Sequence, residues 1–305
     1  LVALILAAGR GTRRKSEKPK VLPPLMGRPV VEHVINAVLY LEPERLDVVT
    51  GFGAQEVELS VSAFLEEVAL KKKFSPPMPI FVRQTEQLGT GHAVAMAQDC
   101  LKDFSGLLLI AYDDMPLISP NTLEGFIKAH QNLGADISVL TVRLQDPAAY
   151  GRIIRGENGW LERIVEYRDA NDEERSISEI NSGLYLADTA ELFRSIENLS
   201  PANDQQEYYL TDVVADFRQR GLTAAAVEIP ANYAFEVQGI NDRSELSRVQ
   251  DFLRMRINES WMKAGVTMLD PVSVYIEAKV KLAPDVTLWP GVILTGHSSI
   301  GAGAE

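Results

Sequence analysis

The first nine residues, LVALILAAG, form an almost uninterrupted apolar run that ends in glycine and leads directly into a basic stretch. A run without polar alternation predicts a strand that is buried on both faces, as in the centre of a parallel sheet. Gly9 and Gly11 leave room for backbone N–H groups to approach an anion. Six cationic side chains follow within eleven residues, at Arg10, Arg13, Arg14, Lys15, Lys18 and Lys20. The N-terminus therefore predicts an α/β fold whose first strand ends at a phosphate-binding loop.

Two familiar phosphate loops do not match this stretch. The dinucleotide fingerprint needs a third glycine where Arg14 stands, and the Walker loop needs Gly-Lys followed by Ser or Thr. LAAGRGTR followed by PKVL instead resembles the opening signature of the sugar-1-phosphate nucleotidyltransferases, and the short spacing from Gly11 to Lys20 resembles their uridylyltransferase branch. The alternative interpretation is a basic surface turn.

Composition limits the class of protein further. The chain has 305 residues and a net charge of -12, which favours two domains and argues against a nucleic-acid or anionic-membrane surface. Cys100 is the only cysteine, so the sequence predicts no disulfide framework and favours a reducing compartment. No apolar run approaches the length of a membrane span. We expect a cytoplasmic protein that binds neither nucleic acid nor membranes.

The next segments alternate between helix and strand patterns. Apolar residues recur at helical spacing in 29–41 and 54–70, whereas 46–51 and 79–83 are strand-like. Gln84–Gln98 then passes from strand through a glycine-containing loop into a helix, which points backbone N–H groups at a ligand. The Gln84 amide can donate and accept at once, as a uracil edge requires, and Gly89 would let a base lie against the backbone. We interpret His92 as a structural hydrogen-bonding residue rather than a catalytic base.

Two carboxylates follow a further apolar strand in Ser105–Ser119, where α/β sheets bind ligands. Because side chains alternate along a strand, Asp113 and Asp114 are expected to face opposite sides. The resemblance assigns the metal to Asp114, whereas Asp113 stands where the family has glycine. Two ordinary turn aspartates are the alternative. Ser119 and Pro120 predict the start of a helix.

The middle of the chain reads as shorter strands, which we expect to form the sugar side of a mixed sheet. By resemblance, Gly151, Glu166 and Asn181 hold the hydroxyls and the N-acetyl group of the sugar, although an Asn before Ser-Gly can also be a turn former. Tyr209 and Thr211 match the same pocket, at the start of a helix predicted over 207–221. A long helix is predicted to end near residue 264.

A six-residue periodicity replaces these patterns after Gly265. Ile276, Leu282, Leu288, Leu294 and Ile300 recur every six residues, each followed four residues later by a residue that is small or β-branched. Six residues make one side of a parallel β-helix with an inward-pointing apolar residue. Three sides complete a coil, so the segment to Glu305 predicts fewer than two coils.

From Leu4 to Glu305 the order of motifs resembles the front part of the bifunctional N-acetylglucosamine-1-phosphate uridyltransferase and glucosamine-1-phosphate acetyltransferase family. The resemblance implies an α/β, Rossmann-like (GT-A-like) nucleotidyltransferase domain with a mixed sheet flanked by helices, a long helix, and the first coils of a left-handed parallel β-helix. We expect a nucleotidyltransferase domain at 1–228, a closing segment with a metal ligand and linker helix at 229–264, and a truncated hexapeptide-repeat β-helix at 265–305.

The implied reaction is Mg²⁺-dependent uridylyl transfer from UTP to N-acetylglucosamine-1-phosphate, giving UDP-N-acetylglucosamine and pyrophosphate. The attacking phosphate is already ionised, so in-line attack needs neither a general base nor a covalent intermediate, and catalysis rests on alignment and charge neutralisation. The resemblance assigns catalysis to Arg13, Lys20 and Asp114, and Mg²⁺ to Asp114 and Asn241, a donor pair that suits this hard ion.

The substrate-binding positions implied by the resemblance belong to the two loops, the strand ends and the sugar side. They are Leu6, Ala7, Ala8, Gly9, Gly11, Thr12, Gln84, Gln87, Gly89, Thr90, Tyr112, Asp113, Gly151, Glu166, Asn181, Tyr209 and Thr211.

Two alternatives differ in testable ways. A related enzyme for another sugar-1-phosphate or nucleotide would keep the basic loop and the metal pair but differ at Gln84, Glu166 and Asn181. A catalytically silent nucleotide-sugar-binding subunit is suggested only by Asp113. The resemblance also implies a homotrimer of the full-length protein through the β-helix, whereas this chain by itself is expected to trimerise weakly or not at all and to transfer no acetyl group.

Overall fold

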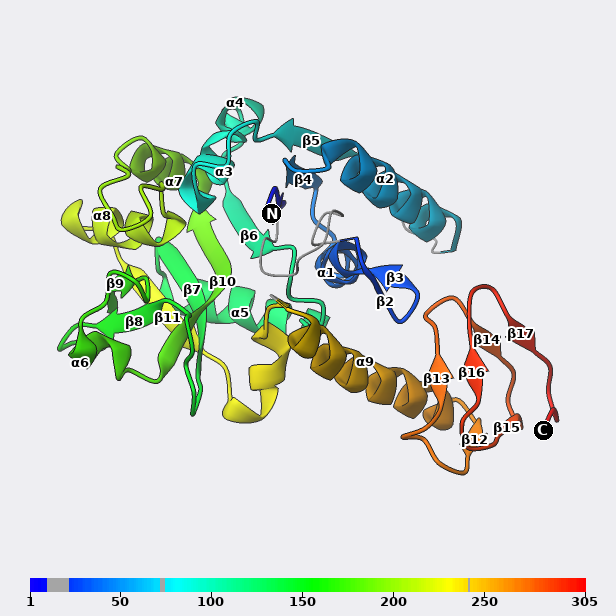
Figure 1. Ribbon diagram of the computed structural model, residues 1–305. Helices are drawn as coiled ribbons and strands as arrows, with labels where there is room; N and C mark the ends of the chain where they lie inside the picture. Colours follow the sequence, from blue (N-terminus) through cyan, green and yellow to red (C-terminus); the bar gives the residue numbers. More distant parts are fainter. Residues whose placement is uncertain (10–21, 72–74, 241) are drawn as a thin grey trace.

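A computed structural model describes residues 1–9, 22–71, 75–240 and 242–305 of the chain. Its main body is a nine-stranded mixed sheet with the path β11-β7-β10-β6-β1-β4-β5, on which β8 pairs with β10 and β9 with β8 (Figure 1). The path comprises β1 (Val2–Ala7), β4 (Arg45–Thr50), β5 (Pro79–Arg83), β6 (Leu107–Tyr112), β7 (Ile137–Arg143), β10 (Glu179–Asp188) and β11 (Ala224–Glu228).

The centre of this sheet is parallel, as the N-terminal apolar run predicts. β1 pairs in parallel with both β4 and β6, and all six of its residues are buried. β10 is antiparallel to both β6 and β7, which makes the sheet mixed. The carboxyl ends of β1 and β6 lie side by side, because Leu6 pairs with Tyr112. Loops that leave these strand ends therefore meet at one edge of the sheet.

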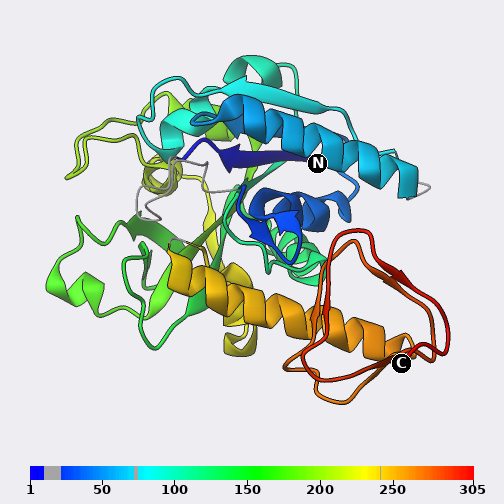
Figure 2. The ribbon, with the colours of Figure 1, turned by 45° about the vertical axis from the view of Figure 1, so that its right-hand side comes forward.

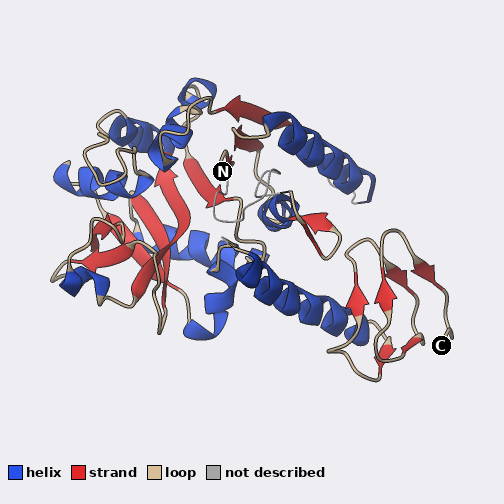
Figure 3. Cartoon of the chain, in the orientation of Figure 1, coloured by secondary structure: helices blue, strands red, loops and turns tan. Residues whose placement is uncertain are grey.

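Helices cover both faces of the sheet (Figure 3). Alternate residues of β1 point to opposite faces, so Ala3 and Ile5 belong to one apolar cluster and Val2 and Leu4 to the other. The first cluster includes residues of α1 (Val30–Leu39), α2 (Ala54–Lys71) and α5 (Pro120–Leu133). The second includes residues of α3 (Thr90–Ala95), α4 (Gln98–Leu101), α7 (Thr189–Ile196) and α8 (Val213–Gln219).

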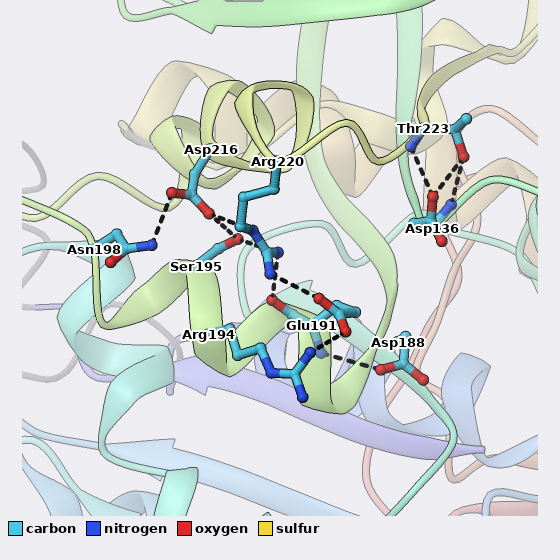
Figure 4. A network of polar contacts seen from close by, with 9 residues as sticks. All are labelled: Asp136, Asp188, Glu191, Arg194, Ser195, Asn198, Asp216, Arg220 and Thr223. Carbon is cyan, nitrogen blue, oxygen red and sulfur yellow. Dashed lines mark hydrogen bonds and ion pairs between the residues drawn. The ribbon is translucent and has the colours of Figure 1, made fainter.

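Polar contacts hold α7 and α8 together on the second face (Figure 4). Ser195 Oγ on α7 donates to Asp216 Oδ2 on α8 at 2.6 Å, and Arg220 pairs with Glu191 Oε2 at 2.7 Å. Beside them Thr223 Oγ1 donates to Asp136 Oδ2 at 2.7 Å, which joins the segments before β11 and β7. These contacts join α7 to α8 and the segment before β11 to the segment before β7.

Several sequence predictions of secondary structure are confirmed, and one is corrected. The helices near 29–41 and 54–70 are α1 and α2, and Ser119 caps α5 by accepting a hydrogen bond from the backbone N of Thr122 at 3.2 Å. The helix predicted over 207–221 begins only at Leu210, as the 3₁₀ turn η2 (Leu210–Asp212) followed by α8. Tyr209 has extended backbone angles, because the segment before it pairs with residues 88 and 91 instead.

A small antiparallel ribbon extends the β10 side of the sheet. It consists of β8 (Arg152–Arg155) and β9 (Leu161–Val165), and α6 (Asp172–Arg175) leads from it back to β10. β10 carries a register shift between Asn181 and Tyr185, which interrupts its pairing with β7. A further 3₁₀ segment, η3 (Ala231–Val237), follows β11.

α9 (Arg243–Lys263) links the main body to the C-terminal segment, and Figure 1 shows it projecting from one to the other. Its start has a capping box, in which Asp242 Oδ1 accepts from the backbone N of Glu245 at 2.8 Å and Glu245 Oε2 accepts from the backbone N of Asp242 at 3.2 Å. A helix of 21 residues is roughly 31 Å long at 1.5 Å per residue. No helix in the described part of the chain is long and apolar enough to cross a membrane.

Residues 265–305 wind as a three-cornered coil (Figure 2). Three parallel pairs join strands that are three apart in the chain: β12 (Thr267–Met268) with β15 (Thr287–Leu288), β13 (Tyr275–Ile276) with β16 (Ile293–Leu294), and β14 (Lys281–Leu282) with β17 (Ser299–Ile300). From β13 to β17 the strands begin every six residues, in step with the sequence period. The assignment of a left-handed β-helix domain, and the three domain boundaries, stay predictions.

The hairpin of β2 (Pro24–Leu25) and β3 (Arg28–Pro29) packs against this coil. The backbone N of Ala278 donates to Met26 O at 2.9 Å, and Lys279 Nζ lies 3.1 Å from Glu67 Oε2 on α2. Gly27 has φ +78°, and a Cβ there would lie 2.8 Å from Glu277 Cδ, so the turn needs glycine for both conformation and space.

Candidate active site

A cavity of about 620 Å³ lies at the carboxyl ends of the central strands. Both loops that the sequence predicts to face a ligand contribute to its wall, and so do residues of the ribbon and of β10. The predicted site residues among its lining are Leu6, Ala8, Gly9, Gln84, Gln87, Gly89, Thr90, Tyr112, Asp113, Asp114, Gly151, Glu166, Asn181 and Tyr209.

The other predicted residues fall into two groups. Ala7 is buried within β1, and Thr211 lies behind the wall, where its Oγ1 donates to Glu166 Oε1 at 3.2 Å. Gly11, Thr12, Arg13, Lys20 and Asn241 lie outside the residues that the structure describes. The structure therefore describes only the two flanks of the basic loop, which are Gly9 at the cavity and the hairpin of β2 and β3.

The expectation that Asp113 and Asp114 face opposite sides rests on strand alternation, which does not apply here. β6 ends at Tyr112, so both aspartates are turn residues, and both line the same cavity. Asp113 is fully buried, and its backbone N donates to Leu6 O at 3.2 Å, whereas Asp114 is half-buried. Asp113 therefore lies closer to the sheet, and Asp114 is the more accessible carboxylate.

The segment before α9 closes the cavity beside Asp114. The backbone N of Ile240 donates to Asp114 O at 3.0 Å, and a Cβ on Gly239 would lie 3.6 Å from the Asp114 carboxylate. The backbone N of Gly239 in turn donates to the hydroxyl of Tyr150 at 3.3 Å. Asn241, the predicted second metal ligand, is the next residue in the chain after this segment, which contacts Asp114, the predicted first ligand.

The predicted nucleobase loop is held by side-chain contacts within a few residues and by backbone contacts with Tyr208. Gln84 is buried, and its Nε2 donates to Gly89 O and lies 3.0 Å from both Gly89 O and His92 Nδ1. Gln87 Nε2 donates to Gln84 O at 3.3 Å. Gly89 has φ +109°, and a Cβ there would lie 2.5 Å from Tyr208 O, so no other residue fits. The prediction that His92 is a structural hydrogen-bonding residue is confirmed by its contact with Gln84.

On the opposite wall the fold brings together Gly151, Glu166 and Thr211. A Cβ on Gly151 would lie 3.6 Å from both carboxylate oxygens of Glu166. Burial raises the pKa of Glu166, the hydrogen bond from Thr211 opposes this, and the nearby carboxylates of Asp212, Asp169 and Glu207 raise it further. A partly dehydrated carboxylate beside a glycine leaves room for hydroxyl donors from a ligand.

Asn181 acts partly as a turn former, which is the alternative role suggested by its position before Ser-Gly. Its Oδ1 accepts from the backbone N of Gly183 at 2.9 Å, and its Nδ2 donates to the Tyr185 hydroxyl at 2.8 Å, which leaves one amide hydrogen for a ligand. Burial raises the pKa of Tyr209 to about 12, so its phenol stays protonated and can donate. Both side chains line the cavity as neutral polar groups.

Sequence reasoning missed Tyr150, Gly239, Glu245 and Arg152. The first three line the cavity, and Arg152 holds the loop that carries Tyr150. Arg152 is only 2% exposed, and its guanidinium donates to Ala148 O at 2.9 Å, to Pro147 O at 3.3 Å and to Tyr150 O. The only available signal was its position directly after Gly151, because carbonyl acceptors carry no side-chain pattern in a sequence.

The charge on the described part of the wall is negative. Five residues with carboxylate side chains line the cavity: Asp113, Asp114, Glu166, Glu207 and Glu245. Among the described residues, no lysine or arginine lines it. A phosphorylated ligand therefore needs positive charge from elsewhere. The sequence supplies it in the basic stretch that begins one residue after Gly9.

The donor set also fits Mg²⁺. In the described residues there is no cluster of three or more His, Cys, Asp or Glu side chains that could hold a metal by itself. Mg²⁺ typically takes one or two protein carboxylates and fills its other positions with water and phosphate oxygens. Asp114, half-buried at the cavity and adjoined by the chain that leads to Asn241, suits such a site.

Comparison with known proteins gives concordant matches. A family model described as a MobA-like NTP transferase domain matches residues 3–203. Proteins named bifunctional protein GlmU are 44% identical over 303 residues in Geobacter metallireducens, covering 99% of this chain and 61% of the relative. The corresponding protein of Thermus thermophilus is 43% identical over 302 residues, covering 99% of this chain and 62% of the relative. The chain thus spans a little over three fifths of the length of these curated relatives.

Solved structures agree at the level of the fold. A UDP-glucose pyrophosphorylase crystallised with UDP-glucose superposes with a TM-score of 0.64 at 17% identity, covering 86% of this chain and 98% of the other. The enzyme of that name from Acinetobacter baumanii gives a TM-score of 0.61 at 19% identity, with the same coverage. The predicted Rossmann-like nucleotidyltransferase fold is confirmed by these superpositions. By the match over residues 3–203, the chain belongs to the family of MobA-like NTP transferase domains.

Proposed function

We propose that this chain transfers the uridylyl group of UTP to N-acetylglucosamine-1-phosphate, forming UDP-N-acetylglucosamine and pyrophosphate. The observation that carries the proposal is a single cavity lined by a buried amide loop, by Asp114 and by a surface of carboxylate and amide groups, in a chain with relatives named GlmU at 43% and 44% identity. One wall offers neutral groups suited to a base, and the other offers Glu166, Asn181 and Tyr209 for sugar hydroxyls and an amide.

The proposed bond changes need no covalent enzyme intermediate. An oxygen of the sugar-1-phosphate forms a bond to the α-phosphorus of UTP, while the bond from that phosphorus to pyrophosphate breaks in line with the attack. The attacking phosphate is ionised at neutral pH, so no side chain has to remove a proton. The protein then contributes alignment and the placing of charge.

We propose that Asp114, with Asn241, holds Mg²⁺, and that the cations of the basic stretch, Arg13 and Lys20 among them, contact the phosphates. A bound Mg²⁺ would neutralise phosphate oxygens and orient the triphosphate. The remaining task of the chain is to hold the base and the sugar so that the two phosphates meet beside Asp114. The described carboxylates of the wall, which would otherwise repel the substrates, make this added positive charge necessary.

Pyrophosphate release tests the proposal directly. The purified chain is incubated with each of four NTPs and a panel of sugar-1-phosphates, with Mg²⁺ and, in parallel, with EDTA. We expect UTP with N-acetylglucosamine-1-phosphate to give the highest kcat/KM, and EDTA to abolish turnover. A different preferred pair would favour a related sugar-1-phosphate nucleotidyltransferase, and no release from any pair would favour a nucleotide-sugar-binding subunit.

The remaining expectations concern assembly and place in the cell. A homotrimer of the whole protein, weak or absent trimerisation of this chain, lack of acetyl transfer by it and a cytoplasmic location all stay predictions. Light scattering of the purified chain tests the second of these, and incubation with glucosamine-1-phosphate and acetyl-CoA tests the third.

A further inference from the structure

The hydrogen-bond partners of the buried Gln84 amide determine which way its oxygen and nitrogen face. Gly89 O can only accept a hydrogen bond, so the Gln84 atom that lies 3.0 Å from it must be the amide nitrogen. Turning the amide by half a rotation would set two oxygens against each other. Backbone hydrogen bonds hold Gly89 in place: Gly89 O also accepts from the backbone N of Ala93 at 3.1 Å, and its neighbours Leu88 and Gly91 both bond to the backbone of Tyr208.

His92 uses the second hydrogen of the same nitrogen. His92 Nδ1 lies 3.0 Å from Gln84 Nε2, and an amide nitrogen cannot accept, so Nδ1 must carry a lone pair and the ring proton must be on Nε2. The imidazole is supported from the other side, with its ring centroid 6.4 Å from that of Tyr208. Tyr208 in turn exchanges backbone hydrogen bonds with Leu88 and Gly91, at 2.8 and 2.7 Å.

We propose that His92, by accepting from Gln84 Nε2, is a positioning residue that holds Gln84 Oε1 toward the cavity and thereby selects uracil over cytosine. Both amide hydrogens are used within the protein, and no described residue donates to Oε1, so Gln84 offers a base an acceptor only and not the donor and acceptor that the sequence predicts. Uracil presents N3–H at its pairing edge and matches an acceptor, whereas cytosine presents a lone pair at N3 and is repelled. The proposal rests on the proposed uridylyl transfer.

Discrimination between uracil and cytosine depends on preventing rotation of the Gln84 side-chain amide. A Gln side chain that could turn freely would present its NH₂ to cytosine as readily as its oxygen to uracil. Gly89 O opposes the turn with one contact, and His92 Nδ1, unprotonated in the tautomer described above, opposes it with a second. His92 therefore acts on specificity without touching the reacting phosphates, and its loss should change the ratio between substrates more than the turnover with UTP.

The test compares kcat/KM for UTP and CTP in three variants. His92→Phe keeps the ring but removes the acceptor, and we expect the UTP:CTP ratio to fall about tenfold. His92→Asn places an amide oxygen near the position of Nδ1, and we expect it to keep the ratio within about threefold of the wild type. His130→Phe is the matched control, because His130 is buried on α5 against Ser138, far from this loop in sequence and on the other face of the sheet. It should leave the ratio unchanged.

Failure of the inference can be told from failure of the proposed function. If the wild type shows no turnover, the same ratio is measured as Kd values for UTP and CTP by calorimetry. A folded His92→Phe protein with an unchanged ratio overturns the proposal, and so does a wild type that prefers CTP. Independently of any substrate, ¹⁵N NMR of the wild type should find His92 protonated at Nε2 and unprotonated at Nδ1. A proton on Nδ1 would also overturn it.

Discussion

The two walls of the cavity are built in different ways. On the first wall the side-chain amide of Gln84 takes its hydrogen-bond partners from a stretch of nine residues, from Gln84 to His92, with spacings of five and eight residues. On the second wall a hydrogen bond joins Glu166 to Thr211, 45 residues apart, and Gly151 lies against Glu166. The Gln84 contacts therefore lie within a short motif, whereas the second wall forms only once β8, β9, β10 and η2 have packed.

The walls also differ in their electrostatic cost. The first presents a neutral amide whose nitrogen is fully hydrogen-bonded. The second holds a carboxylate whose pKa is raised, first by burial and then by neighbouring carboxylates. The comparison indicates that the proposed base side is held in place at little cost to stability, while the proposed sugar side keeps a carboxylate whose burial is unfavourable.

The largest effect is expected where the two walls meet, at Asp114. Asp114→Ala should lower kcat by about 10³-fold or more, because charge stabilisation at such sites is worth several kcal/mol. Lys20→Ala should act in the same direction. Turnover is measured as pyrophosphate release, with thermal melting as the check on folding. The exposed Asp103→Ala serves as the control, and near-normal turnover of folded Asp114→Ala protein would refute the site assignment.

The second wall should be sensitive to a change behind it, at Arg152. Arg152→Met leaves three loop carbonyls without their buried donor, so we expect a loss of stability of about 3 kcal/mol and a KM for the sugar-1-phosphate raised about tenfold. The KM for UTP should change less than threefold. Equal changes in both KM values would show that the loop does not belong to the sugar wall.

Glu166 provides a test of the electrostatic difference. Its folded pKa lies above the ordinary value of 4.5, so the folded state binds the proton more tightly than the unfolded state. Wild-type stability should therefore fall as pH rises from about 4.5 through the raised pKa, and stay low above it. Glu166→Gln should melt a few degrees higher than the wild type at pH 8, with the difference shrinking toward pH 4.5.

The same substitution should weaken sugar binding, raising the KM for the sugar-1-phosphate about tenfold. Glu173→Gln, at an exposed position on α6, is the matched control and should change neither property. If Glu166→Gln melted below the wild type at every pH, the carboxylate would be stabilising, and the contrast between the walls would be wrong.

The smallest effect is expected at Asp113. Asp113 is fully buried at the base of the cavity, where the family signature has glycine. We propose that it supports the site indirectly and that the positive charge proposed above offsets its repulsion of the incoming phosphates, so Asp113→Gly should change kcat/KM by less than about tenfold, or roughly 1.4 kcal/mol. A gain of a hundredfold or more on this substitution would show that Asp113 disables the site.

The contrast between the walls also explains what the sequence could predict. The succession of β1, β4, β5 and β6 along the chain, their helices and the capped start of α5 follow from apolar periodicity and end signals, which are local. The contact of Gly239 with Asp114 and the carbonyl contacts of Arg152 are between segments without a shared pattern. The alternation argument for Asp113 and Asp114 was wrong because it extended the strand two residues past its end at Tyr112.

The contact between the β2–β3 hairpin and the C-terminal coil affects when, during synthesis, the hairpin reaches its final packing. The hairpin that follows the basic stretch docks on a coil whose contacting residue, Ala278, is synthesised about 250 residues after Met26. At typical translation rates of 5–20 residues per second that is a delay of roughly 10–50 s. The central sheet can form during this interval, but the hairpin reaches its final packing only when the segment around Ala278 has emerged. A hairpin made early in synthesis thus waits for a much later segment before its packing is complete.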